Sequence, residues 1–303
     1  MSTLIYRQVG TLAIDPADHP RGLSFLSAAS GLVRVGHRLY VVADDENHLG
    51  VFDADASATG RLIRLFDGNL PESKKQRKAQ KDDLESLLRL PATAAWPGGA
   101  LLALGSGSRP NRFTGALLGL DANGEADGPA RVVDLSPLYA DAGARFEALN
   151  IEGAFIVGDA LLLLQRGSMR APSAVIRFPL DRVMAWLGGA TSRLQPSAIV
   201  ECDLGKADGV PLTFTDGCAL PDGSWLFSAV AEQTGSTYDD GACAGSAIGI
   251  ARGDGTLQEV RRIEPTRKIE GIDARVAGGK ITIDMVTDAD DPAIAAELGE
   301  TIW

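Results

Sequence analysis

The hydrophobic residues of this chain occur in short runs of about five to eight positions, separated by Gly, Asp, Asn and Pro. Runs of this length between turn residues are typical of β-strands joined by tight turns. Helical periodicity is weak and is confined to short stretches at 81–89, 180–187 and 291–298. The pattern therefore predicts an all-β protein with a few short helices.

One arrangement of apolar and polar residues recurs five times along the chain. Each unit begins with an acidic or small residue, usually followed by Gly, and continues with two apolar runs that a turn separates. The residues that begin the five units are Ser30, Glu85, Glu152, Asp216 and Glu270. A spacing of roughly sixty residues accommodates about four strands with their turns, which is one blade of a β-propeller.

The fifth unit is too short for a complete blade, because the chain ends at Trp303 before four strands can follow Glu270. The N-terminal segment 4–14 has the apolar content of an outer strand, and we predict that it closes the last blade. Closure would hide sheet edges that could otherwise pair with other chains. We therefore predict one five-bladed β-propeller domain over residues 1–303, with four-stranded blades. A sixth blade would need a unit that the sequence does not contain.

Composition narrows the range of partners. The 303-residue chain carries a net charge of −11, which disfavours nucleic acid and anionic membrane surfaces. No aliphatic run is long enough to cross a bilayer and no secretory signal is visible, so we expect a cytoplasmic protein. Cys202, Cys218 and Cys243 match no zinc motif and are expected to be reduced thiols. We expect a small-molecule partner, and the oligomeric state stays open.

The residues that begin the five units are candidates for a metal site, and we call them the predicted ring residues. In a propeller the first strand of every blade lines the central channel, so equivalent positions converge on one axis. Four carboxylates and one hydroxyl there would raise one another's pKa values unless a cation neutralises them. Oxygen ligands in this number suit Ca²⁺ better than Zn²⁺. The alternative is that the acidic residues cap turns or pair with cations such as Lys81 and Lys268.

Polar clusters at the ends of the second apolar runs supply candidate catalytic groups. Asp44 or Asp45 could act as a general base on a water molecule. Adjacent strand residues point to opposite faces, so at most one of the two is expected to face the site. Arg166 is expected to hold substrate oxygens during the reaction, with Ser168 as a substrate ligand in the same cluster.

Two further segments are candidates for binding an anionic substrate. The loop 105–112 offers backbone N–H groups and hydroxyls, together with the side chains of Arg109, Asn111 and Arg112, which suit phosphate or carboxylate. The alternative for this loop is an ordinary turn. The basic run 74–81, which ends at Lys81, is either a solvated surface loop or an electropositive lid over an anionic ligand.

The series of predicted ring residues resembles that of the calcium-activated nucleotidases, or apyrases. The resemblance implies a five-bladed propeller with a central Ca²⁺ held by Ser, Glu, Glu, Ser and Glu on successive inner strands. The first, second, third and fifth positions match the series. The fourth position differs, because Asp216 and its neighbour Thr215 stand where the family has Ser.

The flanking segments carry the same resemblance. Residues 36–45 resemble the Gly-Lys-Leu-Tyr-Ser-Val-Asp-Asp-Arg run of that family, although Glu46 stands in place of the Arg. Residues 164–168 resemble its Leu-Pro-Arg-Arg-Ala-Ser run, with one of the two arginines missing beside Arg166. A weaker similarity to bacterial esterase-like phytase propellers supports the same fold.

These features predict a Ca²⁺-dependent hydrolase that acts on a small phosphorylated or anionic molecule at the channel mouth. One alternative is a non-catalytic propeller that binds a small ligand or a protein partner, with the metal as a structural clamp. Another is a propeller of the lactonase or esterase type. The sequence has no nucleophile elbow, P-loop or dinucleotide fingerprint, which disfavours serine hydrolases, kinases and Rossmann oxidoreductases.

Overall fold

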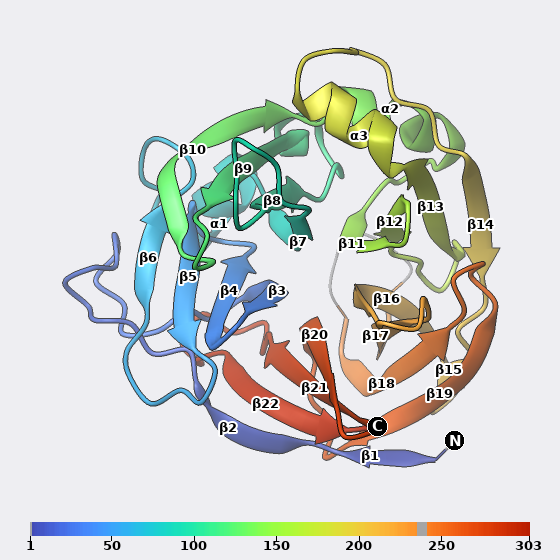
Figure 1. Cartoon of the computed structure of the whole chain (residues 1–303). Helices are drawn as coiled ribbons and strands as arrows, with labels where there is room; N and C mark the ends of the chain where they lie inside the picture. Colours follow the sequence, from blue (N-terminus) through green and yellow to red (C-terminus); the bar gives the residue numbers. More distant parts are fainter. Residues whose placement is uncertain (1, 235–240) are drawn as a thin grey trace.

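The computed structural model describes residues 2–234 and 241–303, which form a ring of five β-sheets around a central channel (Figure 1). This architecture confirms the predicted five-bladed β-propeller. In every blade the first strand of the repeated sequence unit lies innermost, and the following strands pair outward in chain order, except that the outermost strand of the fifth blade comes from the N-terminal segment.

Each blade has four strands in antiparallel order. The first consists of β3 (Ala29–Val35), β4 (Arg38–Ala43), β5 (His48–Asp53) and β6 (Arg61–Arg64). The second consists of β7 (Leu84–Leu90), β8 (Ala100–Gly105), β9 (Thr114–Leu120) and β10 (Ala126–Asp134). The third consists of β11 (Ile151–Val157), β12 (Ala160–Gln165), β13 (Ser173–Pro179) and β14 (Ala198–Cys202). The fourth consists of β16 (Val210–Ala219), β17 (Trp225–Glu232), β18 (Cys243–Ala251) and β19 (Leu257–Glu264), with the short β15 (Lys206–Ala207) beside β16.

The fifth blade is closed by the N-terminal segment, as predicted. Its strands β20 (Ile269–Ala277), β21 (Lys280–Thr287) and β22 (Glu297–Ile302) are completed by β2 (Arg7–Thr11), which pairs antiparallel with β22. The preceding strand β1 (Thr3–Ile5) pairs in parallel with β19 of the fourth blade. The segment therefore joins the outer edges of two blades.

Apolar side chains fill the space between neighbouring blades, with one cluster in each of the five interfaces. Strands β8 and β12 are buried along their whole length, because other blades cover both of their faces. Leu102 and Leu163, one from each strand, belong to the same cluster. This burial explains why these second strands have continuous apolar runs instead of an alternating pattern.

Three α-helices decorate the ring: α1 (Lys74–Gln80), α2 (Ser136–Arg145) and α3 (Leu180–Leu187). The helix expected at 180–187 is confirmed. The helices expected at 81–89 and 291–298 are wrong, because pairing within the second and fifth sheets makes strands of most of the first stretch and of the end of the second. None of the helices within the described residues has the length and apolar character needed to cross a membrane.

A glycine after the first residue of a unit lets neighbouring inner strands approach closely. A Cβ at Gly31 would lie 2.7 Å from the backbone nitrogen of Leu87, and one at Gly153 would lie 2.9 Å from the Cα of Asp216. A Cβ at Gly271 would lie 3.1 Å from the carbonyl carbon of Gly31. The recurrent Gly of the sequence pattern is therefore a packing requirement of a narrow channel.

Candidate functional site

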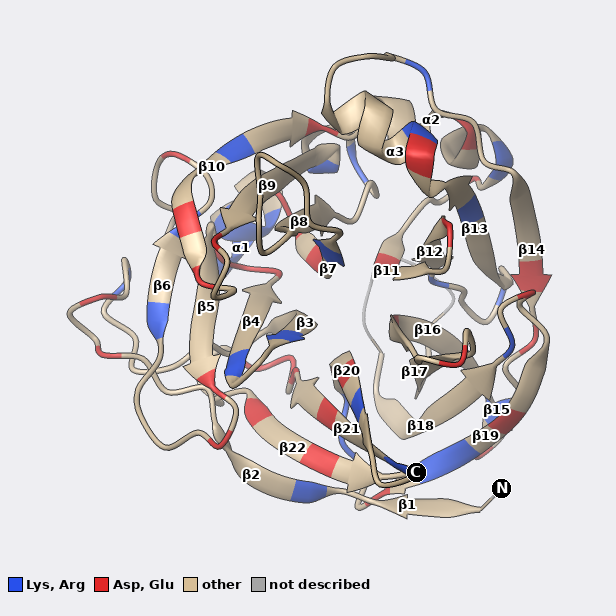
Figure 2. Cartoon of the chain, viewed as in Figure 1, with Lys and Arg blue, Asp and Glu red and all other residues tan. Residues whose placement is uncertain are grey.

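A cavity of about 330 Å³ lies at the end of the channel where the inner strands begin. Four of the predicted ring residues line it: Ser30, Glu85, Glu152 and Glu270. In Figure 2 the strands β7 and β11, which border this central region, carry acidic residues. The cavity therefore combines residues from four blades, as the sequence pattern predicted.

β-Bulges position these four residues. Each is the extra, unpaired residue where the register between the first and second strands of its blade shifts. A bulge re-aims the side chain of the extra residue, and the equivalent bulge in every blade directs it to the same end of the channel. In the fourth blade the register shifts between Phe214 and Asp216, so the extra residue is Thr215.

Asp216 therefore does not occupy the fourth ring position, and it does not line the cavity. It stands where Gly31, Gly153 and Gly271 stand in other blades, next to the neighbouring inner strand. Its buried Oδ2 accepts a hydrogen bond from the backbone N–H of Ile272 in the fifth blade, at 2.9 Å. The predicted fourth ring position was wrong by one residue. Asp216 was chosen because it precedes a Gly, as Glu152 and Glu270 do.

Thr215 supplies a hydroxyl at the position where the nucleotidase series has Ser. Its Oγ1 lies 2.8 Å from the carbonyl oxygen of Ile269, to which it donates, and 2.8 Å from Oγ of Ser228. Thr215 is buried and does not line the cavity. Its hydroxyl therefore ties the fourth blade to the fifth.

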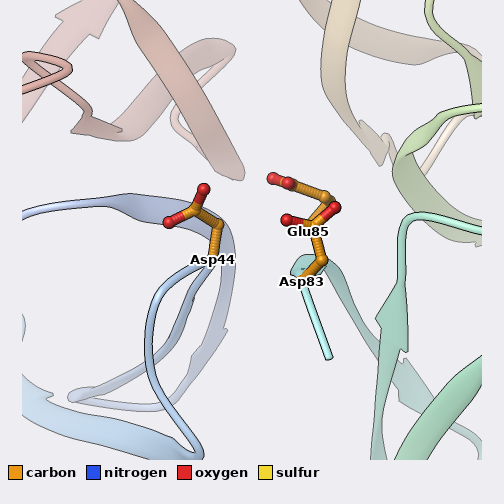
Figure 3. Close-up of side chains that lie close together, drawn as sticks. All are labelled: Asp44, Asp83 and Glu85. Carbon is orange, nitrogen blue, oxygen red and sulfur yellow. The ribbon is translucent and has the colours of Figure 1, made fainter. Parts of the chain in front are cut away.

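Three carboxylates converge on one wall of the cavity. Asp44, Asp83 and Glu85 each have an oxygen within 4.8 Å of the others (Figure 3). Burial raises the pKa of Glu85 well above its usual range, and the nearby Asp83, Glu152 and Asp44 raise it further. Among the described residues Glu85 has no hydrogen-bond or ion-pair partner. Burial also raises the pKa of Asp44 to about 6, although Lys81 opposes this rise.

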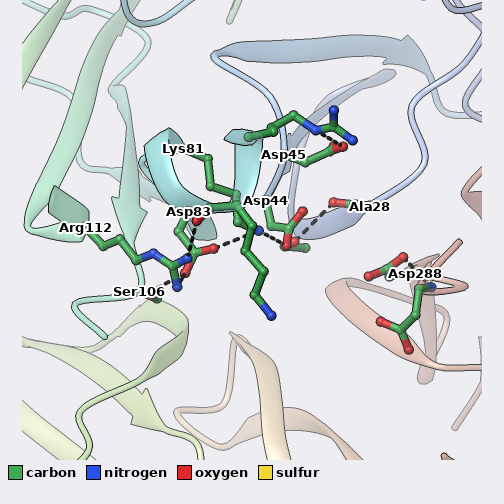
Figure 4. A network of polar contacts seen from close by, with 12 residues as sticks. Ala28, Asp44, Asp45, Lys81, Asp83, Ser106, Arg112 and Asp288 are labelled. Carbon is green, nitrogen blue, oxygen red and sulfur yellow. Dashed lines mark hydrogen bonds and ion pairs between the residues drawn. The ribbon is translucent and has the colours of Figure 1, made fainter. Parts of the chain in front are cut away.

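Lys81 and Arg112 hold this group of acids from the second blade (Figure 4). The Lys81 ammonium contacts the Asp44 carboxylate and lies 2.8 Å from Asp83 Oδ1. Asp83 also accepts hydrogen bonds from Arg112 Nη1 and Ser106 Oγ, both at 2.6 Å. Asp83 was not predicted from the sequence, although its position two residues before Glu85 could have indicated it.

The opposite wall pairs its carboxylates with cations. Arg166 Nη1 lies 3.2 Å from Glu152 Oε1, and its other amino group contacts Glu232. Lys268 Nζ lies 3.3 Å from both Glu232 Oε1 and Glu270 Oε1. The alternative pairing of Lys268 with a ring acid is therefore present in the structure, whereas Lys81 pairs with Asp44 and Asp83.

The expectation that at most one of Asp44 and Asp45 faces the site is wrong, because both residues follow the end of β4 and the alternation of a strand does not apply to them. Asp44 belongs to the three-carboxylate group, while Asp45 accepts a hydrogen bond from Arg77 Nε at 3.1 Å and lies 3.5 Å from Arg21. Both line the cavity. Asp44 is therefore the candidate base, and Asp45 anchors α1 through Arg77.

The predicted substrate ligands divide into two groups. Arg112 and Lys81 line the cavity, but both are engaged by Asp83. Arg109, Asn111 and Ser168 do not line it. Asn111 donates to the backbone oxygen of Lys81 at 3.1 Å, and Ser168 Oγ accepts backbone N–H groups of its own turn.

The basic run at 74–81 forms α1 and the residue after it. Lys74, Arg77, Lys78 and Lys81 all line the cavity, so the run lies over the channel mouth instead of forming a distant surface loop. A helix with this composition supplies positive charge to a site whose walls are rich in carboxylates. The cavity can therefore accept both cations and anions.

Comparisons with known structures show the fold. An α-L-arabinofuranosidase from Podospora anserina in complex with cellotriose is 10% identical, with a TM-score of 0.51 over 99% of this chain and 96% of that chain. A putative exo-β-1,3-galactanase from Bifidobacterium bifidum is 11% identical, with a TM-score of 0.52 over 97% and 92%. A luciferin-regenerating enzyme is 11% identical, with a TM-score of 0.48 over 98% and 95%.

At such identities these similarities concern architecture alone. No curated protein sequence matches the chain. The resemblance to the calcium-activated nucleotidases stays a prediction. Residues 25–301 match the model of a family of unknown function, DUF6929, and the chain therefore belongs to that family.

Proposed function

We propose that this protein is a hydrolase that uses a divalent cation to cleave a small anionic molecule at the channel mouth. The observation that carries the proposal is the convergence of Asp44, Asp83 and Glu85 within 4.8 Å of one another. Burial raises the pKa of Glu85 well above its usual range, and the neighbouring carboxylates raise it further. A bound cation would relieve this repulsion.

The donor set fits a hard cation. Carboxylate oxygens from Asp44, Asp83 and Glu85 would hold it, with the Ser30 hydroxyl on the same cavity wall as a further oxygen donor. Such ligands favour Ca²⁺, Mg²⁺ or Mn²⁺ over softer metals. When bound, the ion would supply Lewis-acid polarisation and a more acidic water.

The chain's own residues account for substrate binding and proton transfer. Lys74 and Lys78 of α1 attract an anion to the mouth. Arg166, held by Glu152 and Glu232, presents a fixed guanidinium on the opposite wall. The Asp44 carboxylate, next to the proposed ion, is the candidate to accept a proton from water. The cavity of about 330 Å³ suits a small molecule.

A non-catalytic anion-binding propeller is the second candidate. It is favoured by the ion pairs Arg166–Glu152 and Lys268–Glu270, which neutralise two ring carboxylates without a metal. In that case the site would bind its ligand through α1 and Arg166 and would catalyse no reaction.

The test uses protein stripped with EDTA. Thermal unfolding is followed with Ca²⁺, Mg²⁺ and Mn²⁺, and the same samples are assayed for phosphate release from nucleotides and sugar phosphates and for lactone opening. Saturable stabilisation by one ion, with turnover that Glu85→Gln abolishes, would support the proposal. Glu201→Gln is the matched control, because Glu201 forms a half-exposed ion pair with Arg145. Absence of any metal-dependent shift would refute the cation site and leave the anion-binding alternative.

A further inference from the structure

A second cavity, of about 780 Å³, lies on the face opposite the channel mouth. Arg34 and Arg275, which line it, lie toward the far ends of the inner strands β3 and β20. Ser30 and Glu270, near the starts of the same strands, belong to the mouth. Arg38 of β4 and Arg7 of β2 complete a set of four arginines around this cavity. Figure 2 shows basic segments on β2, β3 and β4.

Arg34 and Arg275 are fixed by one carboxylate beneath the cavity. Asp284 is buried and does not line the cavity. Its Oδ2 accepts a hydrogen bond from Arg34 Nη1 at 2.9 Å, and its two oxygens lie 2.5 and 2.6 Å from Arg275 Nη1. The two guanidiniums are therefore held side by side by a shared acid behind them.

The other two arginines are also anchored, and the set retains unused donors. Arg7 contacts Glu300, and Arg38 contacts Asp53 and lies 3.1 Å from Glu125. Within the described part of the chain, Nη2 of Arg34, Nη2 of Arg38 and Nε of Arg275 donate to no hydrogen-bond partner. Each guanidinium is thus oriented by an acid and still has N–H groups for a ligand.

Such an arrangement suits an anion with planar or tetrahedral oxygens. Guanidinium groups bind carboxylate and phosphate through paired N–H donors, and donors that are already oriented lose little entropy on binding. Asp53, Asp55 and Glu300 also line this cavity, so an anion would be bound by the oriented, unused N–H groups and not by an excess of positive charge. We propose that this cavity is a second binding site, for a small anion with two or more carboxylate or phosphate groups. The site is independent of the hydrolase proposal.

The proposal is tested by calorimetric titration of the full chain, stripped of metals, with citrate and with pyrophosphate at constant ionic strength. We expect saturable binding of at least one of them. Arg34→Gln and Arg38→Gln should each weaken it by about tenfold or more, since a charge-assisted hydrogen bond is lost. Preference for citrate or for pyrophosphate distinguishes the carboxylate from the phosphate ligand. The side chain of Arg7 is largely exposed, so Arg7→Gln should leave the fold intact. This variant therefore tests an arginine of the cavity without a loss of stability.

Two controls separate this cavity from other basic surfaces. Lys78→Ala changes the mouth, and Arg177→Gln removes an arginine that pairs with Asp159 on the third blade. Neither should alter the affinity. The proposal is overturned if neither anion binds saturably, or if Lys78→Ala abolishes the binding that the arginine variants at the second cavity retain.

Discussion

Asp216 joins the fourth blade to the fifth, because its Oδ2 accepts a hydrogen bond from the backbone N–H of Ile272 at 2.9 Å. Asp216→Ala should leave this buried N–H without a partner and lower the free energy of unfolding by about 1–3 kcal/mol. Asp216→Asn keeps an acceptor and should cost less. Urea unfolding of both variants measures the difference. A cation-induced thermal shift that disappeared in Asp216→Asn would instead return Asp216 to the metal site.

Glu85→Gln should stabilise the metal-free protein. The carboxylate of Glu85 is crowded by Asp44 and Asp83, and its raised pKa reflects burial and these like charges. Removal of the charge should therefore raise the free energy of unfolding at neutral pH by about 1 kcal/mol or more in the presence of EDTA. Urea unfolding of the two proteins in EDTA is the measurement. A variant less stable than the wild type there would mean that the Glu85 carboxylate has a cationic partner.

Glu232 holds two cations of the mouth, Arg166 and Lys268, from a buried position. Glu232→Gln should lower the free energy of unfolding by about 1–3 kcal/mol, because each cation loses a buried partner while Arg166 keeps Glu152 and Lys268 keeps Glu270. Glu201→Gln breaks the exposed pair with Arg145 and should change stability by less than about 1 kcal/mol. Chemical unfolding of the two variants side by side is the measurement. Equal effects would show that the Glu232 pairs are screened like surface pairs.

His48 should make the fold sensitive to acid. Burial and, to a smaller extent, the nearby Arg64 lower the pKa of His48 to about 4. Between pH 6.5 and 4 the unfolded chain binds a proton on this residue that the folded chain does not bind. The free energy of unfolding is therefore not reduced by His48 above about pH 6.5. It decreases as the pH falls toward 4, by up to about 3 kcal/mol.

The measurement is the free energy of unfolding at several pH values for the wild type and for His48→Asn. The difference between the two proteins should change in favour of the variant as the pH falls from 7.5 to 4.5. Parallel curves over this interval would show that His48 is protonated in the folded protein as readily as in the unfolded chain.

The inner-strand glycines should tolerate no side chain. Gly153→Ala would place a Cβ 2.9 Å from the Cα of Asp216, where backbone would have to move, and we expect a loss of at least about 1–3 kcal/mol. Gly143→Ala, in α2, meets no atom within 4 Å and should be neutral or stabilising by up to about 1 kcal/mol. Thermal unfolding compares the two directly. A neutral Gly153→Ala would mean that the inner strands can separate at little cost.

The fold was predictable because every blade of the propeller places similar demands on its sequence. Glycines such as Gly31 and Gly271, and continuous apolar runs in strands covered on both faces, are imposed by the channel and by the blade interfaces. These signals are visible in sequence without knowledge of neighbours. Closure by the N-terminal strand followed from the missing outer strand of the fifth blade.

The site was predicted less completely, because bulges and long-range ion pairs decide it. A bulge at Thr215 instead of Asp216 shifts the fourth position by one residue, and the pattern of apolar residues is the same for both registers. Asp83 adopts a left-handed backbone conformation, with φ of 61°, that turns the chain from α1 into β7. Its pairing with Lys81 and Arg112 depends on how that turn meets the following loop.

The pairing of β2 with β22 also fixes the order of events during synthesis. Arg7 contacts Glu300 across a sequence separation of 293 residues, so β2, one of the first two strands to be synthesised, needs one of the last. The third blade, formed by residues 151–202, can assemble while translation continues, whereas the ring stays open until β22 is released. During that interval the edge of β2 is unpaired and exposed to other chains. Closure of this propeller therefore has to wait for β22, and the opportunity for aggregation lasts until the two strands pair.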